Sequence, residues 1–423
     1  MAPVMCIDQA EYPTLAKVCF TTPAIDNHAH NICKEETNHK YPIESIFSEA
    51  EGTALTNYAQ TSIPAMTAAS QLATLYLCES NWDHLKEIVL GQLTFEDRCK
   101  VCFGYSKIEM VLFDDLLFGA QEDCNGYQWH DQFTNKKNKR IVRLEVLMED
   151  AIRSVFFGSN IQTEVNIEAL NRCRDVFVRE VYKSIMDTEV VAFKSIICYR
   201  SGLDVSPLTT PEEALKQLVP WIAGLRNSSD STLRLNKQTK CLNDWLLTKA
   251  FEEISTHPRG SDFILPVQFH VGLGDKSVQL TKSRPSYLQT LIEHFPNLPI
   301  VLLHACYPFT REAGYLASVY ENVWLDFGEI FPMISTIGQI SAVKEMFEVC
   351  PTGKLLWSSD AHFHPEGFYL ASCQARTVLY HVLVEMIKIK SIDESQANEI
   401  VKKVLFLNSN GLYRLGLSLE DSK

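Results

Sequence analysis

The chain has 423 residues, of which 46% are hydrophobic and 22% are charged, and its formal net charge is −13. This composition is typical of a globular protein with a sizeable core, and the acidic balance argues against nucleic acid or an anionic membrane as a partner. No apolar run reaches the roughly 18 residues of a membrane span, and the first residues show no secretory leader. The 13 scattered cysteines indicate reduced thiols, so we expect a cytoplasmic location.

Short apolar runs that end in polar residues alternate with helical stretches along the chain. The runs are rich in Val, Ile, Leu and Phe, as strands buried on both faces are. Eight such runs are present: PAIDNHAH (23–30), IEMVLFDD (108–115), RIVRLEV (140–146), VVAFKSI (190–196), LPVQFHV (265–271), PIVLLHA (299–305), NVWLDFGE (322–329) and KLLWSSDAH (354–362). Eight strand–helix units predict a (β/α)8 barrel of the TIM type.

The stretch from about 40 to 107 is too long for a single crossover between the first two strands. We therefore predict a mostly helical insertion after the first strand. No repeat, low-complexity tract or linker divides the sequence, so we expect residues 1–423 to form one barrel domain.

Polar side chains close several of the runs, and in such barrels the catalytic face lies at the carboxyl ends of the strands. Six residues stand at or near such an end: His28, His30, Lys194, His270, His304 and Asp360. His28 and His30 are two positions apart in a strand and therefore point to the same side. Any one of the six has an ordinary explanation as a hydrogen-bonded core group. Their shared position at the ends of different strands favours one common site.

Histidine nitrogens and aspartate oxygens are the usual ligands of a catalytic zinc or similar divalent ion, which keeps one position open for water. Such an ion lowers the pKa of its water toward about 7. Asp360, in WSSDAHFHPE, is the residue that we expect to accept a proton from this water and to pass it to the leaving group. The sequence thus predicts a site for one or two divalent ions, with zinc as the expected metal.

Lys194 lies inside an apolar strand, where an outward-facing ammonium group would be buried without a partner. We therefore expect it to face the mouth of the barrel, where two roles stay open. It is either a cationic contact for the substrate or, after reaction with carbon dioxide, a carbamate that bridges two metal ions. A protonated lysine beside a divalent ion is unfavourable, which favours the carbamate. The charged Arg200, six residues further on, leaves the end of this strand undefined.

The order of these residues resembles the amidohydrolase superfamily. Six motifs look like the amidohydrolase-2 half of FluG-type and nodulin–glutamine-synthetase-like proteins: DNHAHNI, FKSIICYRSGL, QFHVGLGD, VLLHACYPFTREAGYLA, VWLDFGE and LLWSSDAHFHPEGFYLA. The resemblance covers most of residues 20–415. FluG-type proteins commonly carry a glutamine-synthetase-like domain after this half.

The resemblance implies roles for five of the residues named above. His28, His30 and Asp360 would be metal ligands, and His270 and His304 would be ligands or donors beside them. Asp360 and His304 are accordingly the candidate catalytic residues, with Asp360 as the general base.

Candidate substrate contacts follow the fourth, sixth and seventh strands. They are Tyr199, Arg200, Tyr307, Arg311 and Glu329. An arginine at the mouth of a site suits a carboxylate, which it can hold with two parallel hydrogen bonds. For each arginine, a salt bridge on the surface is the alternative.

We predict a metal-dependent hydrolase that cleaves an amide or related C–N bond of a small, carboxylate-bearing molecule. The link to glutamine-synthetase-like domains suggests a γ-glutamyl amide or isopeptide, by analogy. A metal-dependent decarboxylase or other lyase is one alternative, and a catalytically silent signalling or scaffold protein is another. The complete set of histidines and aspartate argues against the scaffold. A homo-oligomer is an open expectation.

Overall fold

The structure, a computed structural model, describes residues 11–115, 122–158, 163–227 and 233–420. Eight parallel strands form one sheet in the order of the chain, and each strand coincides with one of the eight predicted runs, with β3 beginning one residue before its run. The strands are β1 (Ala24–Ala29), β2 (Ile108–Asp114), β3 (Lys139–Arg143), β4 (Val190–Ser195), β5 (Val267–Phe269), β6 (Ile300–Leu302), β7 (Val323–Asp326) and β8 (Leu355–Leu356). The predicted (β/α)8 barrel is confirmed.

The barrel closes between β1 and the segment that follows the very short β8. The backbone N–H of Asp360 donates to the carbonyl of His28 at 3.0 Å, and the N–H of His30 donates to the carbonyl of Ala361 at 2.8 Å. These two bonds place Asp360 directly beside the two histidines of β1. The closing seam of the barrel is therefore also the place where three predicted metal ligands meet.

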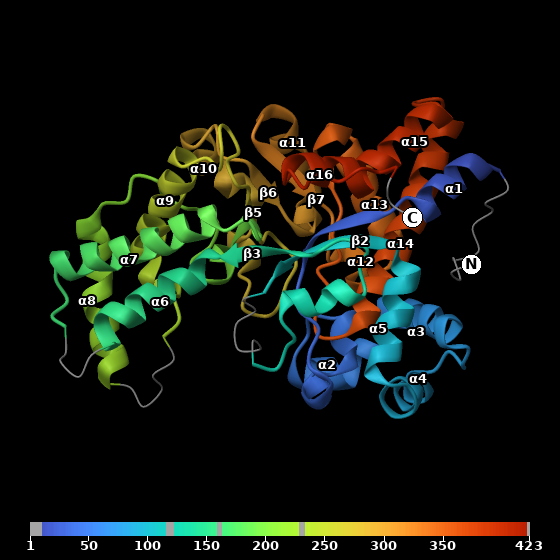
Figure 1. Cartoon of the computed structure of the whole chain (residues 1–423), viewed down its shortest axis with the longest axis horizontal. Helices are drawn as coiled ribbons and strands as arrows, with labels where there is room; N and C mark the ends of the chain where they lie inside the picture. The colour runs from blue at the N-terminus through green and yellow to red at the C-terminus, as the bar shows by residue number, and fades with distance from the viewer. Residues whose placement is uncertain (1–10, 116–121, 159–162, 228–232, 421–423) are drawn as a thin grey trace.

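Helices cover the outside of the barrel, as the alternating pattern predicts (Figure 1). Apart from two additions, they are α1 (Pro13–Thr21), α10 (Gln289–His294), α11 (Thr310–Val319), α12 (Ile330–Met333), α13 (Thr336–Phe347), α14 (Pro365–Lys388), α15 (Glu394–Lys402) and α16 (Asn408–Leu412). The long helix α14 packs against α1, α13 and α15.

The predicted insertion after the first strand is confirmed. It consists of the short helices η1 (Glu35–Lys40) and η2 (Ile43–Ile46), then α2 (Gly52–Tyr58), α3 (Ile63–Tyr76), α4 (Trp82–Glu87) and α5 (Phe95–Ser106). The buried Arg98 of α5 donates two hydrogen bonds, at 2.8 and 2.9 Å, to the buried carboxylate of Glu366 at the start of α14. This pair fixes the insertion against the segment that follows β8.

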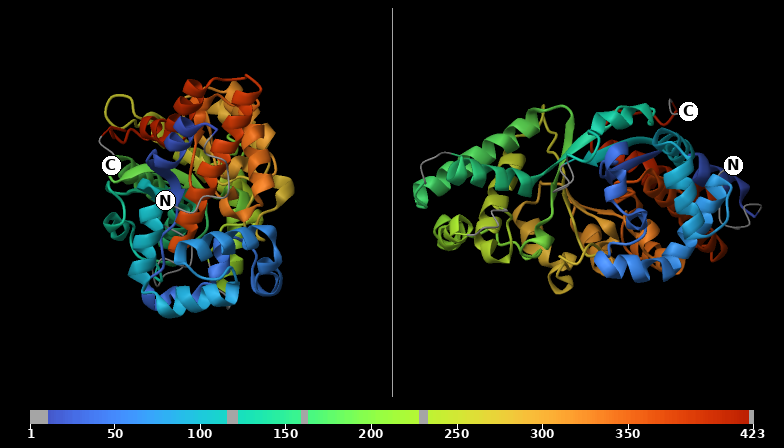
Figure 2. Two further views of the ribbon diagram at one scale, coloured as in Figure 1. Left: turned by 90° about the vertical axis from the view of Figure 1, so that its right-hand side faces the viewer. Right: turned by 90° about the horizontal axis from the view of Figure 1, so that it is seen from below.

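A second addition consists of two helices, instead of one, after each of β3 and β4. These are α6 (Leu144–Phe157) and α7 (Ile167–Met186), then α8 (Pro211–Asn227) and α9 (Lys240–Thr256). They pack on one another and form a lobe at the left of Figure 1, away from the insertion, and the right-hand view of Figure 2 shows the same separation. The sequence pattern did not distinguish these paired helices from single crossovers.

A network of polar side chains occupies the barrel interior below the site. The amide of Asn27 donates to Asp326 at 2.7 Å, and the hydroxyl of Tyr413, just past α16, donates to Asn27 at 3.0 Å. The amide of Gln268 in β5 donates to the same hydroxyl at 2.8 Å. Buried polar groups need such partners, so this network fixes the orientation of Gln268.

Among the described residues, no helix is long and apolar enough to cross a membrane. Residues 1–10, on which part of the expectation about a leader rests, lie outside the described residues.

Candidate metal centre and cavity

The predicted ligands from β1 and β8 converge on the carboxylate of Asp360. Its Oδ1 lies 3.2 Å from Nε2 of His28 and 3.4 Å from Nε2 of His30. Its Oδ2 lies 3.9 Å from Nδ1 of His304, which follows β6. The structure therefore brings four of the predicted residues together, and all four are buried.

Hydrogen bonds on the far side of each β1 imidazole fix which nitrogen faces Asp360 with a lone pair. Nδ1 of His28 lies 2.8 Å from Oε1 of Gln268, whose amide nitrogen is already engaged, so this Nδ1 carries the hydrogen and donates it. Nδ1 of His30 donates in the same way to the carbonyl of Asp114 at 3.0 Å. Both Nε2 atoms are thus acceptors, which is the form in which histidine binds a metal.

Three acceptor atoms, the two Nε2 atoms and Oδ1 of Asp360, consequently face one another with no hydrogen between them. Oδ1 of Asp360 and both ring nitrogens of His304 are buried without a hydrogen-bond partner. Buried polar atoms in native proteins nearly always have a partner, and a divalent cation would supply one to Oδ1 of Asp360 and to the one ring nitrogen of His304 that carries a lone pair. The residues present therefore fit a metal ion.

A second group of potential ligands adjoins the first and shares His304. Nδ1 of His304 lies 3.2 Å from Oε2 of Glu329, and the ring centres of His270 and His304 are 4.4 Å apart. His270, His304 and Glu329 offer ligand atoms within 4.8 Å of one another, as do His28, His304 and Asp360. The arrangement has donors for one ion or for two.

The loop after β5 holds His270 in place. Nε2 of His270 lies 2.5 Å from the carbonyl of Leu273, to which it donates, and 2.9 Å from the hydroxyl of Tyr199. Its Nδ1 therefore carries a lone pair. Glycines on both sides of Leu273 make this turn possible, because a Cβ on Gly274 would lie 2.2 Å from the Tyr199 hydroxyl, and Gly272 has a φ of +82°.

Three of the site residues have left-handed backbone conformations that non-glycine residues rarely adopt. The φ angles are +66° for His304, +61° for Glu329 and +53° for Asp360. Each such conformation costs roughly 1–3 kcal/mol and persists where the surroundings enforce it. Such strain clusters at functional sites, and here it directs three side chains from three different strand ends to one point.

Burial and neighbouring charges set the ionisation of the cluster. Burial, assisted by the nearby Lys194 ammonium group, lowers the pKa of His28 to about 4, and burial holds the pKa of His270 and His304 well below the usual range. Burial opposes ionisation of Asp360, but the neighbouring His304 holds the pKa of this carboxyl well below its usual value. Neutral imidazoles and an ionised carboxylate are the forms that bind a metal.

Lys194 faces the mouth of the barrel, as the burial argument predicts. Its Nζ lies 3.2 Å from Nε2 of His28, and the residue is 1% exposed. Burial lowers the pKa of this ammonium group, although Asp360 and Asp114 oppose the shift. This position is compatible with both roles that the sequence leaves open for Lys194, a contact for the substrate and a carbamate that bridges two metal ions.

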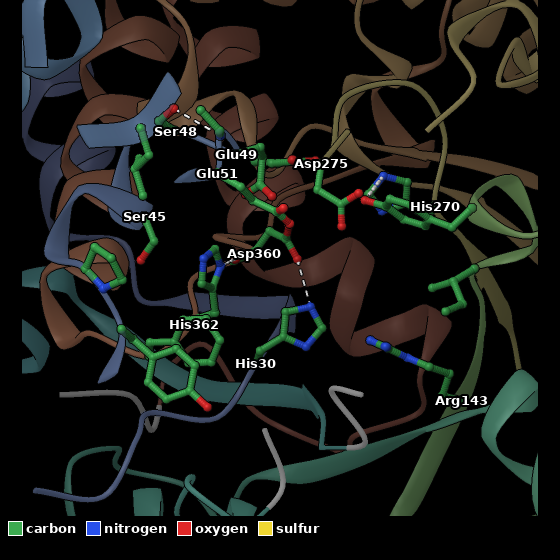
Figure 3. A pocket seen from close by; sticks show the side chains of 18 of the residues that line it. His30, Ser45, Ser48, Glu49, Glu51, Arg143, His270, Asp275, Asp360 and His362 are labelled. Carbon is green, nitrogen blue, oxygen red and sulfur yellow. Dashed lines mark hydrogen bonds and ion pairs between the residues drawn. The ribbon is translucent and has the colours of Figure 1, made fainter. Parts of the chain in front are cut away.

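A cavity of about 560 Å³ opens above the cluster, within the usual range for small-molecule sites (Figure 3). The insertion contributes residues 41–55 to its lining, and the lobe side contributes Arg143, Arg200 and Arg234. His30, His270, Glu329 and Asp360 form part of its floor. The insertion and the segments at the ends of β3 and β4 thus line the same cavity.

The structure places the five predicted substrate contacts unequally. Tyr199, Arg200 and Glu329 line the cavity, whereas Tyr307 and Arg311 do not. The side chain of Arg311 is 68% exposed and forms an ion pair with Glu348 at 3.1 Å, so the surface alternative describes it better. Tyr307 is half-buried beside Gly272, with its carbonyl against that glycine.

Several residues that line the cavity or lie directly behind its lining, as Asp114 does, were not among the predicted site residues. Arg143 and Asp114 end β3 and β2 and carried the same end-of-strand signal that identified the histidines. Arg143 donates to Asp114 through Nε at 3.0 Å, and Arg143 holds the pKa of this carboxyl, which burial alone would raise, down at about 2. Glu49 and Asp275 lie in the insertion and in a loop, where no periodic pattern marks a site.

Comparisons with known proteins agree with this fold and site. Residues 262–415 match the family model described as amidohydrolase. The chain is 39% identical over 421 residues to the protein FluG of Emericella nidulans, covering 96% of this chain and 47% of FluG. It therefore spans about half the length of this relative. The predicted resemblance to amidohydrolase-2-type barrels and to the amidohydrolase half of FluG is confirmed.

Two solved structures illustrate the likeness of fold. One, from Lactobacillus casei ATCC 334 and named as a proposed metal-dependent hydrolase, superposes with a TM-score of 0.77 at 23% identity, covering 95% of this chain and 98% of that chain. The other, a uronate isomerase from Bacillus halodurans C-125, has a TM-score of 0.61 at 10% identity, covering 97% of both chains. At these identities the likeness concerns the barrel alone.

Proposed function

We propose that the chain is a metal-dependent hydrolase of an amide or related C–N bond in a small, carboxylate-bearing molecule. The observation that supports this proposal most strongly is the convergence of buried acceptor atoms on Asp360. Nε2 of His28 and Nε2 of His30 lie 3.2 and 3.4 Å from Oδ1 of Asp360, and none of these three atoms carries a hydrogen of its own. The donor that reaches them is the Lys194 ammonium group, 3.2 Å from Nε2 of His28.

His28, His30 and Asp360 would hold one ion, with His304 and His270 beside them and Lys194 and Glu329 at the edge. A bound zinc or similar divalent ion would supply a water whose pKa is lowered toward about 7. The donor set of imidazole and carboxylate suits zinc.

Asp360 is the residue that we assign to proton transfer. Its carboxylate is ionised, lies on the cavity floor, and its Oδ2 is directed toward His304 rather than toward the β1 histidines. It can therefore accept the proton of an attacking water and return it to the departing amine, while His304 stabilises the charge that develops next to it.

Arg200 is the candidate for binding a substrate carboxylate. Its side chain is buried beneath the cavity mouth, makes no hydrogen bond within the described residues, and lies 3.7 Å from its nearest carboxylate oxygen, Oε1 of Glu149. A guanidinium group with unused donors at a cavity wall suits a carboxylate. A γ-glutamyl amide or isopeptide, which carries such a group, belongs to this class of substrate.

The proposal is tested by metal analysis of the purified protein and by release of amine from a panel of N-acyl and γ-glutamyl amides. We expect about one or two equivalents of divalent metal and amine release that a chelator abolishes and added metal restores. Carbon dioxide release without amine would instead identify a decarboxylase on the same barrel. Less than about a tenth of an equivalent of metal after metal-supplemented expression, with no product from any substrate, would support a scaffold.

A further inference from the structure

The charged side chains around the cavity are separated by sign. Figure 3 shows Glu49, Glu51 and Asp275 together on one side of Asp360, and Arg143 on the other side. Arg200 also lines the cavity. Burial lowers the pKa of Arg200; the carboxylate of Glu149 behind it opposes this shift, whereas Arg234 and Arg143 add to it, so the three cations lie near one another.

The acidic side crowds carboxyl groups together that the protein itself only partly pairs. Glu51 pairs with Lys276, and Asp275 accepts a hydrogen bond from the N–H of Ser277 at 2.6 Å. The carboxylate of Glu49, by contrast, has neither a hydrogen bond nor an ion pair within the described residues. Burial and the charges of Asp360, Asp275 and Glu51 raise its pKa to about 8. Carboxylates crowded in this way favour a cationic ligand.

On the basic side, the guanidinium group of Arg200 has hydrogen-bond donors that no acceptor among the described residues uses. Arg200 is 6% exposed, its Nε has no hydrogen-bond partner, and no hydrogen bond of its guanidinium group occurs within the described part of the chain. A buried cation without hydrogen bonds is costly unless a ligand supplies them. The acidic side thus favours a cationic group of a ligand, and the basic side independently favours an anionic group.

The candidate metal centre lies between the two sides, because Asp360 stands between Glu49 and Arg143 in the cavity (Figure 3). A substrate that reaches both sides must pass over the floor where the scissile bond would be attacked. Two charges on a single carbon atom, as in a simple α-amino acid, would not be separated enough to use both sides.

We propose that the cavity takes an amide with an ammonium group on one flank of the scissile bond and a carboxylate on the other. Glu49 and Asp275 bind the ammonium group, and Arg200 and Arg143 bind the carboxylate. Short dipeptides and amides between an amino acid and a diamine belong to this class. The inference rests on the proposed amide hydrolysis, since that reaction places the bond over Asp360.

The test measures binding, which needs no turnover, by calorimetry on the metal-loaded protein. The probes are 6-aminohexanoate, its isomer 2-aminohexanoate, and hexanoate. We expect 6-aminohexanoate to bind at least about tenfold more tightly than either of the others, because only its charges are far enough apart to form both ion pairs.

Variants test whether the acidic side of the cavity causes the tighter binding of 6-aminohexanoate. The double variant Glu49→Gln and Asp275→Asn should abolish the advantage of 6-aminohexanoate over hexanoate while leaving hexanoate binding within about twofold. Glu51→Gln, on the same side but already paired with Lys276, is the matched control and should retain most of the advantage.

Equal binding of 6-aminohexanoate and hexanoate, tighter binding of 2-aminohexanoate, or no binding of any probe at millimolar concentration would overturn the inference. Its outcome is separate from that of the proposed hydrolysis. If the protein prefers 6-aminohexanoate but cleaves no amide, the proposed hydrolysis is wrong and the inference about binding stands. If the protein cleaves amides but shows no preference for 6-aminohexanoate, the proposed hydrolysis stands and the inference about binding is wrong.

Discussion

The floor and the mouth of the cavity are built in different ways. On the floor, His28 is held by Gln268 and His30 by the carbonyl of Asp114, so each imidazole has one orientation. At the mouth, Glu49 and Arg200 extend long side chains that have no hydrogen bond within the described residues. The floor side chains are each held in one orientation, as a metal site requires, whereas the mouth keeps donors and acceptors that the proposed ligand would use.

This difference also separates the two kinds of element that build the site. The floor residues come from the ends of strands in the hydrogen-bonded barrel, while Glu49 and Asp275 come from the insertion and from a loop. Barrel enzymes commonly vary substrate through loops and keep chemistry on the strand ends. We therefore expect changes on the floor to remove the reaction and changes at the mouth to alter its substrate.

Asp360→Asn should have the largest effect, because it removes the charge from the centre of the floor. The amide keeps the shape and one oxygen, so the barrel should still fold, but it can neither accept a proton nor balance a cation. Loss of general-base catalysis alone lowers kcat by about 10²–10⁴-fold. The measurements are kcat, metal content and melting temperature beside wild type. Activity within about threefold of wild type would show that proton transfer uses another group.

Gln268→Leu should come next, because it removes the acceptor that orients His28 without touching the metal ligands. Outer partners of this kind change metal affinity by about 10–100-fold, so we expect weaker metal binding in competition with a chromophoric chelator. Excess metal should restore most of the rate. Tyr413→Phe, one hydrogen bond further away, is the control and should weaken metal binding less. Unchanged affinity in Gln268→Leu would mean that the strand alone orients His28.

The floor was largely predictable from the sequence, and the reason is physical. A parallel barrel places the carboxyl ends of all strands at one rim, so polar residues that close apolar runs must meet there. This argument identified His28, His30, His270, His304 and Asp360 by position alone. The same rule applied to Arg143 and Asp114, whose strand ends carry the same signal, and would have identified them too.

The mouth was not predictable in this way. Glu49 reaches the cavity through the insertion, whose place is fixed by contacts with α14 such as the buried pair of Arg98 and Glu366, which are 268 positions apart in the sequence. No periodic pattern records such a distant contact. Arg311 shows the opposite failure, because it follows the predicted metal ligand His304 in the chain yet lies at the start of a surface helix, where its side chain is exposed. Proximity in sequence to a ligand is a weaker guide than position at a strand end.

Arg200→Lys should have a moderate effect that depends on the substrate. Lysine keeps the charge but loses the fork of parallel donors. For a carboxylate-bearing amide we expect kcat/KM to fall about tenfold, the equivalent of one hydrogen bond to a charged group. The matched neutral amide should change by less than about twofold. Equal losses on both substrates would indicate that Arg200 supports the cavity wall through Glu149 and does not bind the carboxylate.

Arg311→Lys should have the smallest effect, and it serves as the matched control for Arg200→Lys. Both substitutions exchange the same side chains in segments that follow strands, so any general consequence of losing a guanidinium group should affect both. Arg311, however, is exposed and pairs with Glu348 outside the cavity, in a solvent-screened contact that a lysine can also make. We therefore expect its kcat/KM on the charged and the neutral amide, and its melting temperature, to equal those of wild type within error. A selective loss on the carboxylate-bearing amide in Arg311→Lys would require that α11 moves over the cavity in solution. The mouth would then extend beyond the residues that line it in this structure, and the distinction between a fixed floor and an open mouth would have to include this helix.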